Sequence, residues 1–266
     1  MRLEPPMLMN VRRCAMLALI LSSLCATASA QTLSFRQGVN SYTGAQDTMV
    51  RSNLTSPGQG QNPVTGAQDT NYGNLTFMGV DGDDGEPDLR PNHVLIRFDG
   101  VFGFGPNQIR ATDSIVSATL RLDVFNEGSG FKVHDMLTDW AQGTVTWNSL
   151  NNGVSADGVE AGLAAIATFG ANNSSPHVVT GVLLIDVTSS LRAVQSGSLP
   201  GFGWALLPFV NGVNGIDFHT SEAAVGLRPE LVVATIPEPA QYALMGAGLA
   251  VVGLVSRRRR TPQAGA

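Results

Sequence analysis

Cysteine, lysine and aromatic residues are scarce in this 266-residue chain. The two cysteines, Cys14 and Cys25, both precede the region that is rich in strand patterns, so disulfide and thiol chemistry are excluded from that region. Aromatic residues make up 6% of the chain, whereas apolar residues make up 43%, which is enough to build a core. A core can therefore form although aromatic residues are few.

Basic residues are also few between the two ends. Residues 31–236 contain nine basic and nineteen acidic side chains, a net charge near −10, whereas the whole chain carries −5 because its ends are basic. Binding to nucleic acid or to anionic lipid needs arginine and lysine gathered on one face. The composition disfavours both classes of partner.

Sequence motifs of common enzymes are missing as well. The chain has no H-E-x-x-H, P-loop or G-x-G-x-x-G, and the segment nearest to a G-x-S-x-G elbow, Gly153–Asp157, ends in aspartate. The four histidines are single and scattered, as in ordinary sheets, and do not have metal-ligand spacing. We expect no enzymatic activity, although carboxylates from different strands can meet in a glycosidase site.

The N-terminus has the three parts of a secretory signal. Arg12 and Arg13 precede the apolar run Cys14–Cys25, and small residues follow at Ala28 and Ala30. We predict a signal helix in residues 1–30, with signal peptidase cutting after Ala30. The alternative is a buried N-terminal helix, but the run has no amphipathic face.

The C-terminus carries a second apolar run between two polar signals. Pro237-Glu238-Pro239 precedes Ala240–Val255, which is apolar except for Gln241, and a basic cluster follows at Arg257, Arg258, Arg259 and Arg260. A run of sixteen residues is near the minimum for a membrane-spanning helix, and arginines favour the cytoplasmic side. We predict a single transmembrane helix followed by a cytoplasmic tail, residues 261–266.

This arrangement resembles the PEP-CTERM sorting signal of Gram-negative bacteria, which an exosortase recognises. The resemblance implies that residues 237–260 hold the chain in the inner membrane until the exosortase cuts near Pro237 to Pro239. The protein would then reach the cell surface or the extracellular matrix. The alternative is a permanent single-pass anchor.

The region between the ends has the period-two pattern of strands. In residues 115–125, Val116, Ala118, Leu120, Leu122 and Val124 alternate with polar residues. We expect further strands at 48–52, 74–80, 94–98, 131–136, 163–169, 178–187, 203–209, 216–219 and 231–234, and a helical turn at 189–196. One-sided patterning over about ten strands predicts an all-β antiparallel two-sheet sandwich, jelly-roll-like, in residues 31–236. The loops at 53–63 and 148–162 are expected to bury little.

Several short segments together resemble the DNRLRE-domain family. They are Gln46–Arg51, Asp69–Gly73, Val94–Phe98, Ser117–Leu122, Trp140 with Thr144–Trp147, Asp186–Thr188, and Phe218–Glu222 with Arg228-Pro229. The resemblance implies a β-sandwich module of secreted and cell-surface proteins, some of whose relatives bind carbohydrate. The domain is therefore expected to be structural or to bind extracellular polysaccharide; the alternative is a polysaccharide-active enzyme or its accessory module.

Two groups of side chains are candidates for binding. Arg97, Arg121, Lys132 and His134 occupy outward positions of expected strands and are predicted to line one basic strip for a glycan, with a solvated sheet face as the alternative. Trp140 and Trp147 are expected to pack under a loop. Trp204 is compatible with packing in the core and with binding a sugar.

The segment 81–88 is strongly acidic. Its carboxylates, on a glycine-hinged loop, suit calcium, the one cofactor that the sequence suggests. The spacing does not fit an EF-hand, so a solvated acidic loop is the alternative. The candidate ligands are Asp81, Asp83, Asp84, Glu86 and Asp88.

Overall fold

The computed structural model describes residues 30–52, 66–82, 91–172, 177–210, 212, 214–237 and 248. Residues Gln31–Thr235 form a compact unit of their own. The predicted signal helix and the apolar run Ala240–Val255 lie outside the described residues, apart from Ala30 and Gly248. Within the described part, we find no helix long and apolar enough to cross a bilayer, so the predicted transmembrane helix stays unconfirmed.

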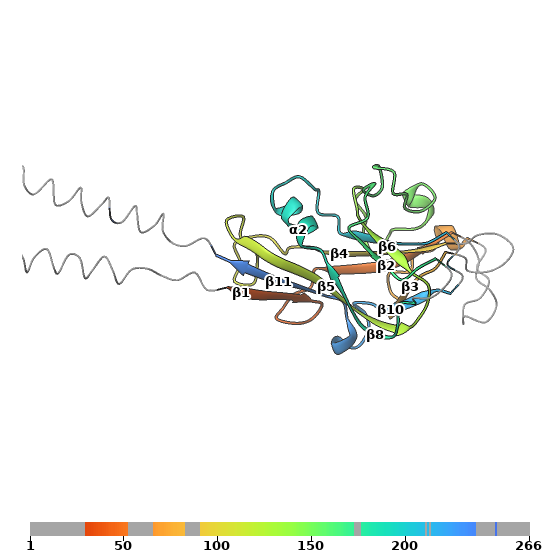
Figure 1. The fold of residues 1–266 in the computed structure, drawn as a ribbon, viewed down its shortest axis with the longest axis horizontal. Helices are drawn as coiled ribbons and strands as arrows, with labels where there is room; N and C mark the ends of the chain where they lie inside the picture. The colour runs from red at the N-terminus through yellow and green to blue at the C-terminus, as the bar shows by residue number, and fades with distance from the viewer. Residues whose placement is uncertain are drawn as a thin grey trace, which may run out of the picture. The chain divides into compact units, whose positions relative to one another are not determined.

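Two antiparallel sheets build this unit (Figure 1). Sheet A has the strand order β1-β11-β5-β10-β3, and β8 pairs with β5. Sheet B has the order β2-β4-β9-β6-β7. The strands of sheet A are β1 (Gln31–Arg36), β3 (Phe77–Val80), β5 (Ser114–Asn126), β8 (Gly181–Asp186), β10 (Ile216–His219) and β11 (Glu230–Ile236). Those of sheet B are β2 (Ala45–Arg51), β4 (Asn92–Phe98), β6 (Phe131–Asp135), β7 (Ala167–Phe169) and β9 (Trp204–Pro208).

The helical segments are short. An α-helix, α2 (Thr188–Gln195), follows β8 where the sequence predicts a helical turn. Three 3-10 turns are η1 (Ala67–Asp69), η2 (Asn148–Leu150) and η3 (Val225–Leu227). The predicted all-β two-sheet sandwich is thus confirmed for the described residues, and every expected strand has a counterpart.

One strand and one residue depart from the prediction. No strand was predicted at β1. Its short pattern buries only Leu33 and Phe35, and its paired strand β11 comes last among the strands of the chain. Val116 was expected to face the core but is exposed, while its neighbour Ile115 is buried. The reason is local: the Arg192 guanidinium donates to the carbonyl oxygens of both residues, at 2.7 to 3.0 Å, and the alternation becomes regular only from Ala118 onward.

The core lies between the inner faces of the two sheets. Alternate residues of β4, β5, β6 and β9 meet there, and most are fully buried. Each fully buried aliphatic or phenyl side chain contributes about 1.5–3 kcal/mol relative to exposure. The largest fully buried side chains of this core include Phe35, Phe131, Phe218, Met78, Ile96, Leu120, Leu122, Ile185 and Leu206.

A second apolar cluster covers the outer face of sheet B. There Leu95 and Ala205 pack against Trp140, Trp147 and Leu150 from the segment that follows β6. The expectation that loop 148–162 buries little is therefore wrong: Leu150, Val154 and Ala161 are all buried. Spacing alone did not reveal that the two tryptophans bring this loop onto the sheet.

His93 shows how completely that loop seals the sheet. Its ring centre lies 4.8 Å from that of Trp147, and its Nδ1 accepts the Val154 N–H at 3.1 Å. Burial lowers the pKa of His93 to about 3, so the ring is neutral and remains an acceptor.

A buried carboxylate ties the two sheets together at one edge. Asp47 of β2 accepts the Ser221 N–H, 3.0 and 3.1 Å from its two oxygens, and Ser221 follows β10 of sheet A. Burial raises the pKa of Asp47 to about 7, and the nearby Glu222 adds to the rise, while the hydrogen bonds from Ser221 oppose it.

We expect the Asp47→Asn variant to lose a pH-dependent part of the folding free energy. The folded state binds the Asp47 proton more tightly than the unfolded chain, whose pKa is near 3.8, so stability falls as the pH rises between those two values. Each pH unit in this window costs up to about 1.4 kcal/mol. Urea unfolding from pH 4 to pH 8 checks this, with the exposed Asp157→Asn as control; parallel curves for wild type and Asp47→Asn would contradict it.

Candidate functional site

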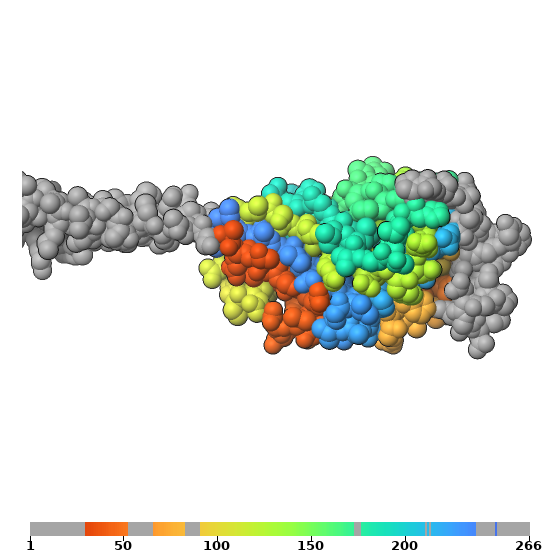
Figure 2. Space-filling view, turned by 60° about the horizontal axis from the view of Figure 1, so that its bottom comes forward, coloured from red at the N-terminus to blue at the C-terminus, as the bar shows by residue number. Residues whose placement is uncertain are grey.

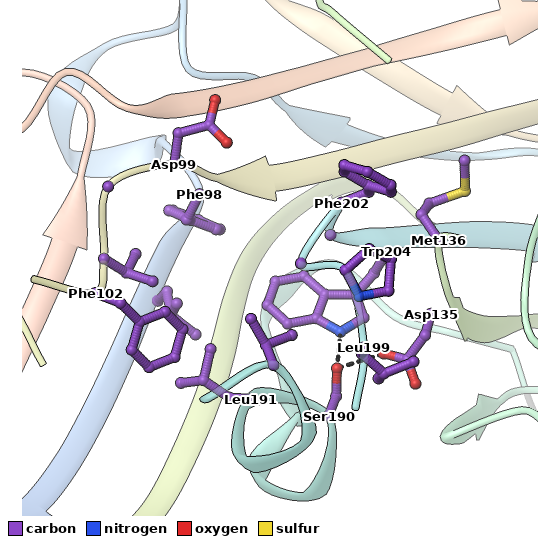
Figure 3. Close-up of a pocket in the computed structure, with 17 residues that line it drawn as sticks. Phe98, Asp99, Phe102, Asp135, Met136, Ser190, Leu191, Leu199, Phe202 and Trp204 are labelled. Carbon is purple, nitrogen blue, oxygen red and sulfur yellow. Dashed lines mark hydrogen bonds between the residues drawn. The ribbon is translucent and has the colours of Figure 1, made fainter. Parts of the chain in front are cut away.

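A pocket of about 220 Å³ lies where three strands of sheet B end together. Phe98 is the last residue of β4, Asp135 is the last residue of β6, and Trp204 is the first residue of β9. In the strand pairing, Trp204 lies opposite both Ile96 and Asp135. The connections at these ends, with α2, form the walls (Figure 3). The lining residues are Phe98, Asp99, Gly100, Val101, Phe102, Asp135, Met136, Ser190, Leu191, Val194, Leu199, Pro200, Gly201, Phe202, Gly203, Trp204 and Leu231.

Gly203 lets the wall approach the sheet closely. Its φ is +80°, and a Cβ at this position would lie 2.1 Å from the carbonyl oxygen of Ile96. The Gly203 carbonyl accepts the Met136 N–H at 2.9 Å. Only glycine can hold both the conformation and the contact here.

Ser190 connects three elements through two hydrogen bonds. Trp204 Nε1 donates to Ser190 Oγ at 2.8 Å, and Ser190 Oγ donates to Asp135 Oδ1. Figure 3 shows Ser190 between the indole and the carboxylate, with both bonds dashed. We call these residues the Asp135–Ser190–Trp204 array; it fixes α2 against β6 and β9.

The position of Ser190 depends on how α2 begins. Asp186, at the end of β8, accepts the Thr188 N–H at 2.9 Å, and hydrogen bonds from Thr188 lower the pKa of Asp186. Thr188 also bonds to β5, where the Ala118 N–H donates to its hydroxyl at 2.9 Å. These contacts turn the chain from strand to helix and direct Ser190 to the pocket.

The two carboxylates of the pocket differ in environment. Burial raises the pKa of Asp135, although the hydrogen bonds from Ser190 and Trp204 act in the opposite direction. Asp99 instead forms an ion pair with Arg97, whose Nε lies 2.9 Å from Asp99 Oδ1, and it also accepts the side-chain amide of Gln46. Asp99 is therefore an ion-paired carboxyl group, whereas Asp135 is a half-buried carboxyl group that two neighbouring side chains contact.

Arg97 also supports the aromatic wall. Its guanidinium lies 5.4 Å from the ring centre of Trp140 and forms an ion pair with Asp139 at 2.5 Å. Trp140 Nε1 donates to the carbonyl oxygen of Phe202 at 2.9 Å, and Phe202 lines the pocket. The sequence predicted Arg97 as a glycan-binding residue, whereas in the structure its guanidinium forms ion pairs with two carboxylates.

The lining combines aromatic rings with hydrogen-bonding oxygens. Phe98, Phe102, Phe202 and Trp204 supply rings, and the two carboxylates with Ser190 supply oxygens. None of the seventeen lining residues, all of which are described, is lysine, arginine or histidine. Such a site suits a ligand that has both C–H faces and hydroxyl donors, and it disfavours an anion.

The four residues predicted for glycan binding do not form one basic strip. Arg97, Lys132 and His134 belong to sheet B, whereas Arg121 lies on β5 of sheet A. His134 is buried, and its Nδ1 donates to the Gly162 carbonyl oxygen at 2.8 Å. Lys132 is exposed, with Nζ 5.4 Å from the ring centre of Phe209. The strip was wrong because alternation gives a residue's phase in its own strand but does not tell which sheet the strand joins.

The tryptophans are placed as follows. Trp140 and Trp147 are buried in the second apolar cluster, which confirms the expectation that they pack under a loop. Trp204, for which both roles were open, belongs to the inter-sheet core and also lines the pocket, with 4% of its surface exposed.

The predicted calcium loop is only partly described. Asp81 forms an isolated bridge with Asn92, whose N–H donates to the Asp81 carbonyl oxygen at 2.8 Å. The other candidate ligands, Asp83, Asp84, Glu86 and Asp88, lie outside the described residues. Among the residues that are described, no three histidine, cysteine or acidic side chains gather to hold a metal ion. The calcium site stays a prediction.

Three of the segments that carry the DNRLRE resemblance meet in one polar network around Gln142. Its Nε2 donates to Glu222 Oε1 and to the Gly73 carbonyl oxygen, both at 2.6 Å, and its Oε1 accepts the Asp47 N–H at 3.0 Å. Asn71 donates to the Gln142 carbonyl oxygen at 2.7 Å. The network joins β2, the segment before β3, the loop after β6 and the segment after β10, so these residues have a structural role.

Comparison with known proteins identifies the C-terminus. The family model of the PEP-CTERM protein-sorting motif matches residues 235–260. The predicted sorting signal is thereby confirmed, and it implies an exported protein that an exosortase sorts to the cell surface. A search of the curated proteins returned no match.

Sequence reasoning missed most of the pocket. Phe102, Asp135 and Ser190 come from a loop, a strand end and a helix that are distant in sequence. The only signal was the Asp186–Thr188 segment, which marks the start of α2 but does not indicate what α2 faces. The pocket arises from tertiary structure.

Replacing Ser190 by alanine should destabilise the domain and raise the pKa of Asp135 further. The change removes a donor to Asp135 and leaves the Trp204 N–H buried without its acceptor, at a cost of about 1–3 kcal/mol. Urea unfolding measures the stability, and carboxyl chemical shifts against pH report the Asp135 pKa. Ser196→Ala, on the exposed end of α2, is the control; equal stability and an unchanged Asp135 pKa would contradict the role of the array.

Proposed function

We propose that this protein is an exported, non-catalytic carbohydrate-binding module of the DNRLRE type that holds a neutral sugar residue of extracellular polysaccharide in the pocket at the end of sheet B. The observation that carries the proposal is the lining itself: four aromatic rings, two carboxylates and a hydroxyl, with no basic side chain. Sugar rings present C–H faces to aromatic side chains and hydroxyls to acceptors.

The size and charge of the pocket narrow the ligand class. A volume of about 220 Å³ is below the roughly 300–1,000 Å³ of sites for drug-sized molecules, so one sugar ring is a suitable occupant. The lining offers no basic side chain to pair with a uronic acid or a sulfated sugar. The net charge near −10 of residues 31–236 also disfavours binding of an anionic sugar.

The sorting signal supports the same role. An exosortase substrate is exported, and the extracellular matrix is where polysaccharide is available. The calcium loop, if loaded, would stabilise a module that lacks cysteine. If the protein binds no soluble glycan, the alternative role at the same location is that of a purely structural matrix protein.

A second candidate, a polysaccharide-active enzyme, is favoured by one observation. The pocket contains two carboxyl groups: Asp135, whose pKa burial raises, and Asp99, which forms an ion pair with Arg97. Glycosidases use such a pair as acid and base. However, Asp135 is bound to Ser190 within the array, which favours a structural carboxylate.

We expect purified residues 31–236 to adsorb to a neutral polysaccharide without cleaving it. Phe102→Ala should weaken adsorption about tenfold or more, equivalent to about 1.4 kcal/mol, because it removes a ring from the pocket. Phe104→Ala is the matched control, since Phe104 lies two residues away, is 92% exposed and does not line the pocket. A panel of insoluble glycans with a reducing-end assay measures both properties.

Three outcomes separate the candidates. Adsorption that Phe102→Ala weakens and Phe104→Ala leaves unchanged supports the binding module. Release of reducing ends that is lost in Asp135→Asn supports the enzyme. Absence of both adsorption and reducing-end release with every neutral glycan overturns both candidates and leaves the structural matrix protein.

A further inference from the structure

The strand β8 is an edge that lacks the usual protection. Among the described strands it pairs only with β5, so its other side is a sheet edge. Its sequence, Gly-Val-Leu-Leu-Ile-Asp, contains no lysine or proline and has a charge only at the end. Edge strands with exposed apolar residues readily pair with another strand. Figure 2 shows the segment containing β8, in teal, on the surface of the domain.

The other edge strands differ from β8. β7 has three residues and β3 has four, lengths that offer few hydrogen bonds. β1 alternates apolar with polar residues and ends in arginine. β2 contacts η1 and β3, and six of its seven residues are buried. β8 is therefore the edge that combines length, apolar character and absence of cover in the described part of the chain.

Two apolar side chains of β8 face outward. Val182 is 52% exposed and Leu184 is 59% exposed, whereas Ile185 is buried in the core. In the register with β5, Leu184 lies opposite Arg121 and Val182 lies opposite Asp123. Each apolar residue thus has a charged neighbour on one side and an unpaired strand edge on the other.

We propose that a second copy of this chain pairs with β8 in an antiparallel, two-fold arrangement that joins the two A sheets into one. Directly opposed residues of antiparallel strands point to the same face of a sheet. A register centred on Leu183 satisfies this rule, because Val182 then faces Leu184 of the second copy and both lie on the outer face. A two-fold contact closes on itself and does not extend into a fibre.

The charges around β8 fit this partner. Across the joined sheet, the row Arg121–Leu184 continues into Val182 and Asp123 of the second copy, so each row ends in opposite charges. Asp186 faces Thr180 of the second copy, and no two like charges oppose each other. A second copy is thus complementary to the strand in apolar pattern and in charge.

The size of the contact defines the strength of the dimer. A six-residue strand is about 20 Å long, and its edge buries less than the roughly 1,200–2,000 Å² of a stable interface. We therefore expect a weak, reversible dimer. Display at high local density on a surface would favour it by raising the effective concentration.

Sedimentation velocity of residues 31–236, which contain both apolar clusters, tests the proposal between about 10 μM and about 1 mM, the range of weak association. Wild type should shift from monomer to dimer with concentration. Leu184→Glu should remain monomeric, because its carboxylate is tolerated beside Arg121 in the monomer but would be buried against Val182 of the second copy. Val159→Glu is the matched control, since Val159 is 64% exposed and lies outside sheet A.

A crosslinking variant tests the register separately. Residues 31–236 contain no cysteine, so Leu184→Cys introduces a single thiol. In the proposed register the two thiols are diagonal neighbours, about 7–8 Å apart, and a short bismaleimide should join them. Val159→Cys should not crosslink. A wild-type monomer at every concentration, a Leu184→Glu dimer, or equal crosslinking of both cysteine variants would each overturn the proposal.

Discussion

Packing of aliphatic and phenyl side chains between two antiparallel sheets holds this domain together. Its residues include no cysteine, and the described part shows no group of side chains that would hold a metal ion. The inner faces of β4, β5, β6 and β9 supply a large part of the inter-sheet core. Polar contacts such as Asp47 with Ser221 connect the two sheets next to this core.

The pocket follows from the same packing. Three strands of sheet B end at one level, and α2 closes over them through the Asp135–Ser190–Trp204 array. Trp204 belongs both to the core and to the pocket lining, so the site cannot change shape independently of the fold. This rigidity suits a binding module, because a preformed site loses little entropy when it binds a ligand.

The sequence predicted the sandwich well because its signals are local. Alternation over residues 118–124 identified β5, and asparagine, glycine and proline clusters separated the strands. The failures concern information that arises only in three dimensions: the partner of β1, the contact of Arg192 with Ile115 and Val116, and the sheet to which Arg121 belongs. The candidate site is the extreme case, since Phe102, Asp135 and Ser190 meet only after folding. The sorting signal was predictable because its function depends on a contiguous motif.

We infer that the inter-sheet core of residues 31–236 suffices to hold the fold. Native-state hydrogen exchange on this segment, resolved by residue, measures it most directly. We predict that buried amides of β4, β5 and β9 exchange only through global unfolding, at one common free energy, while those of the loops exchange faster. Rapid exchange throughout these three strands would show that the inter-sheet core alone does not hold the fold.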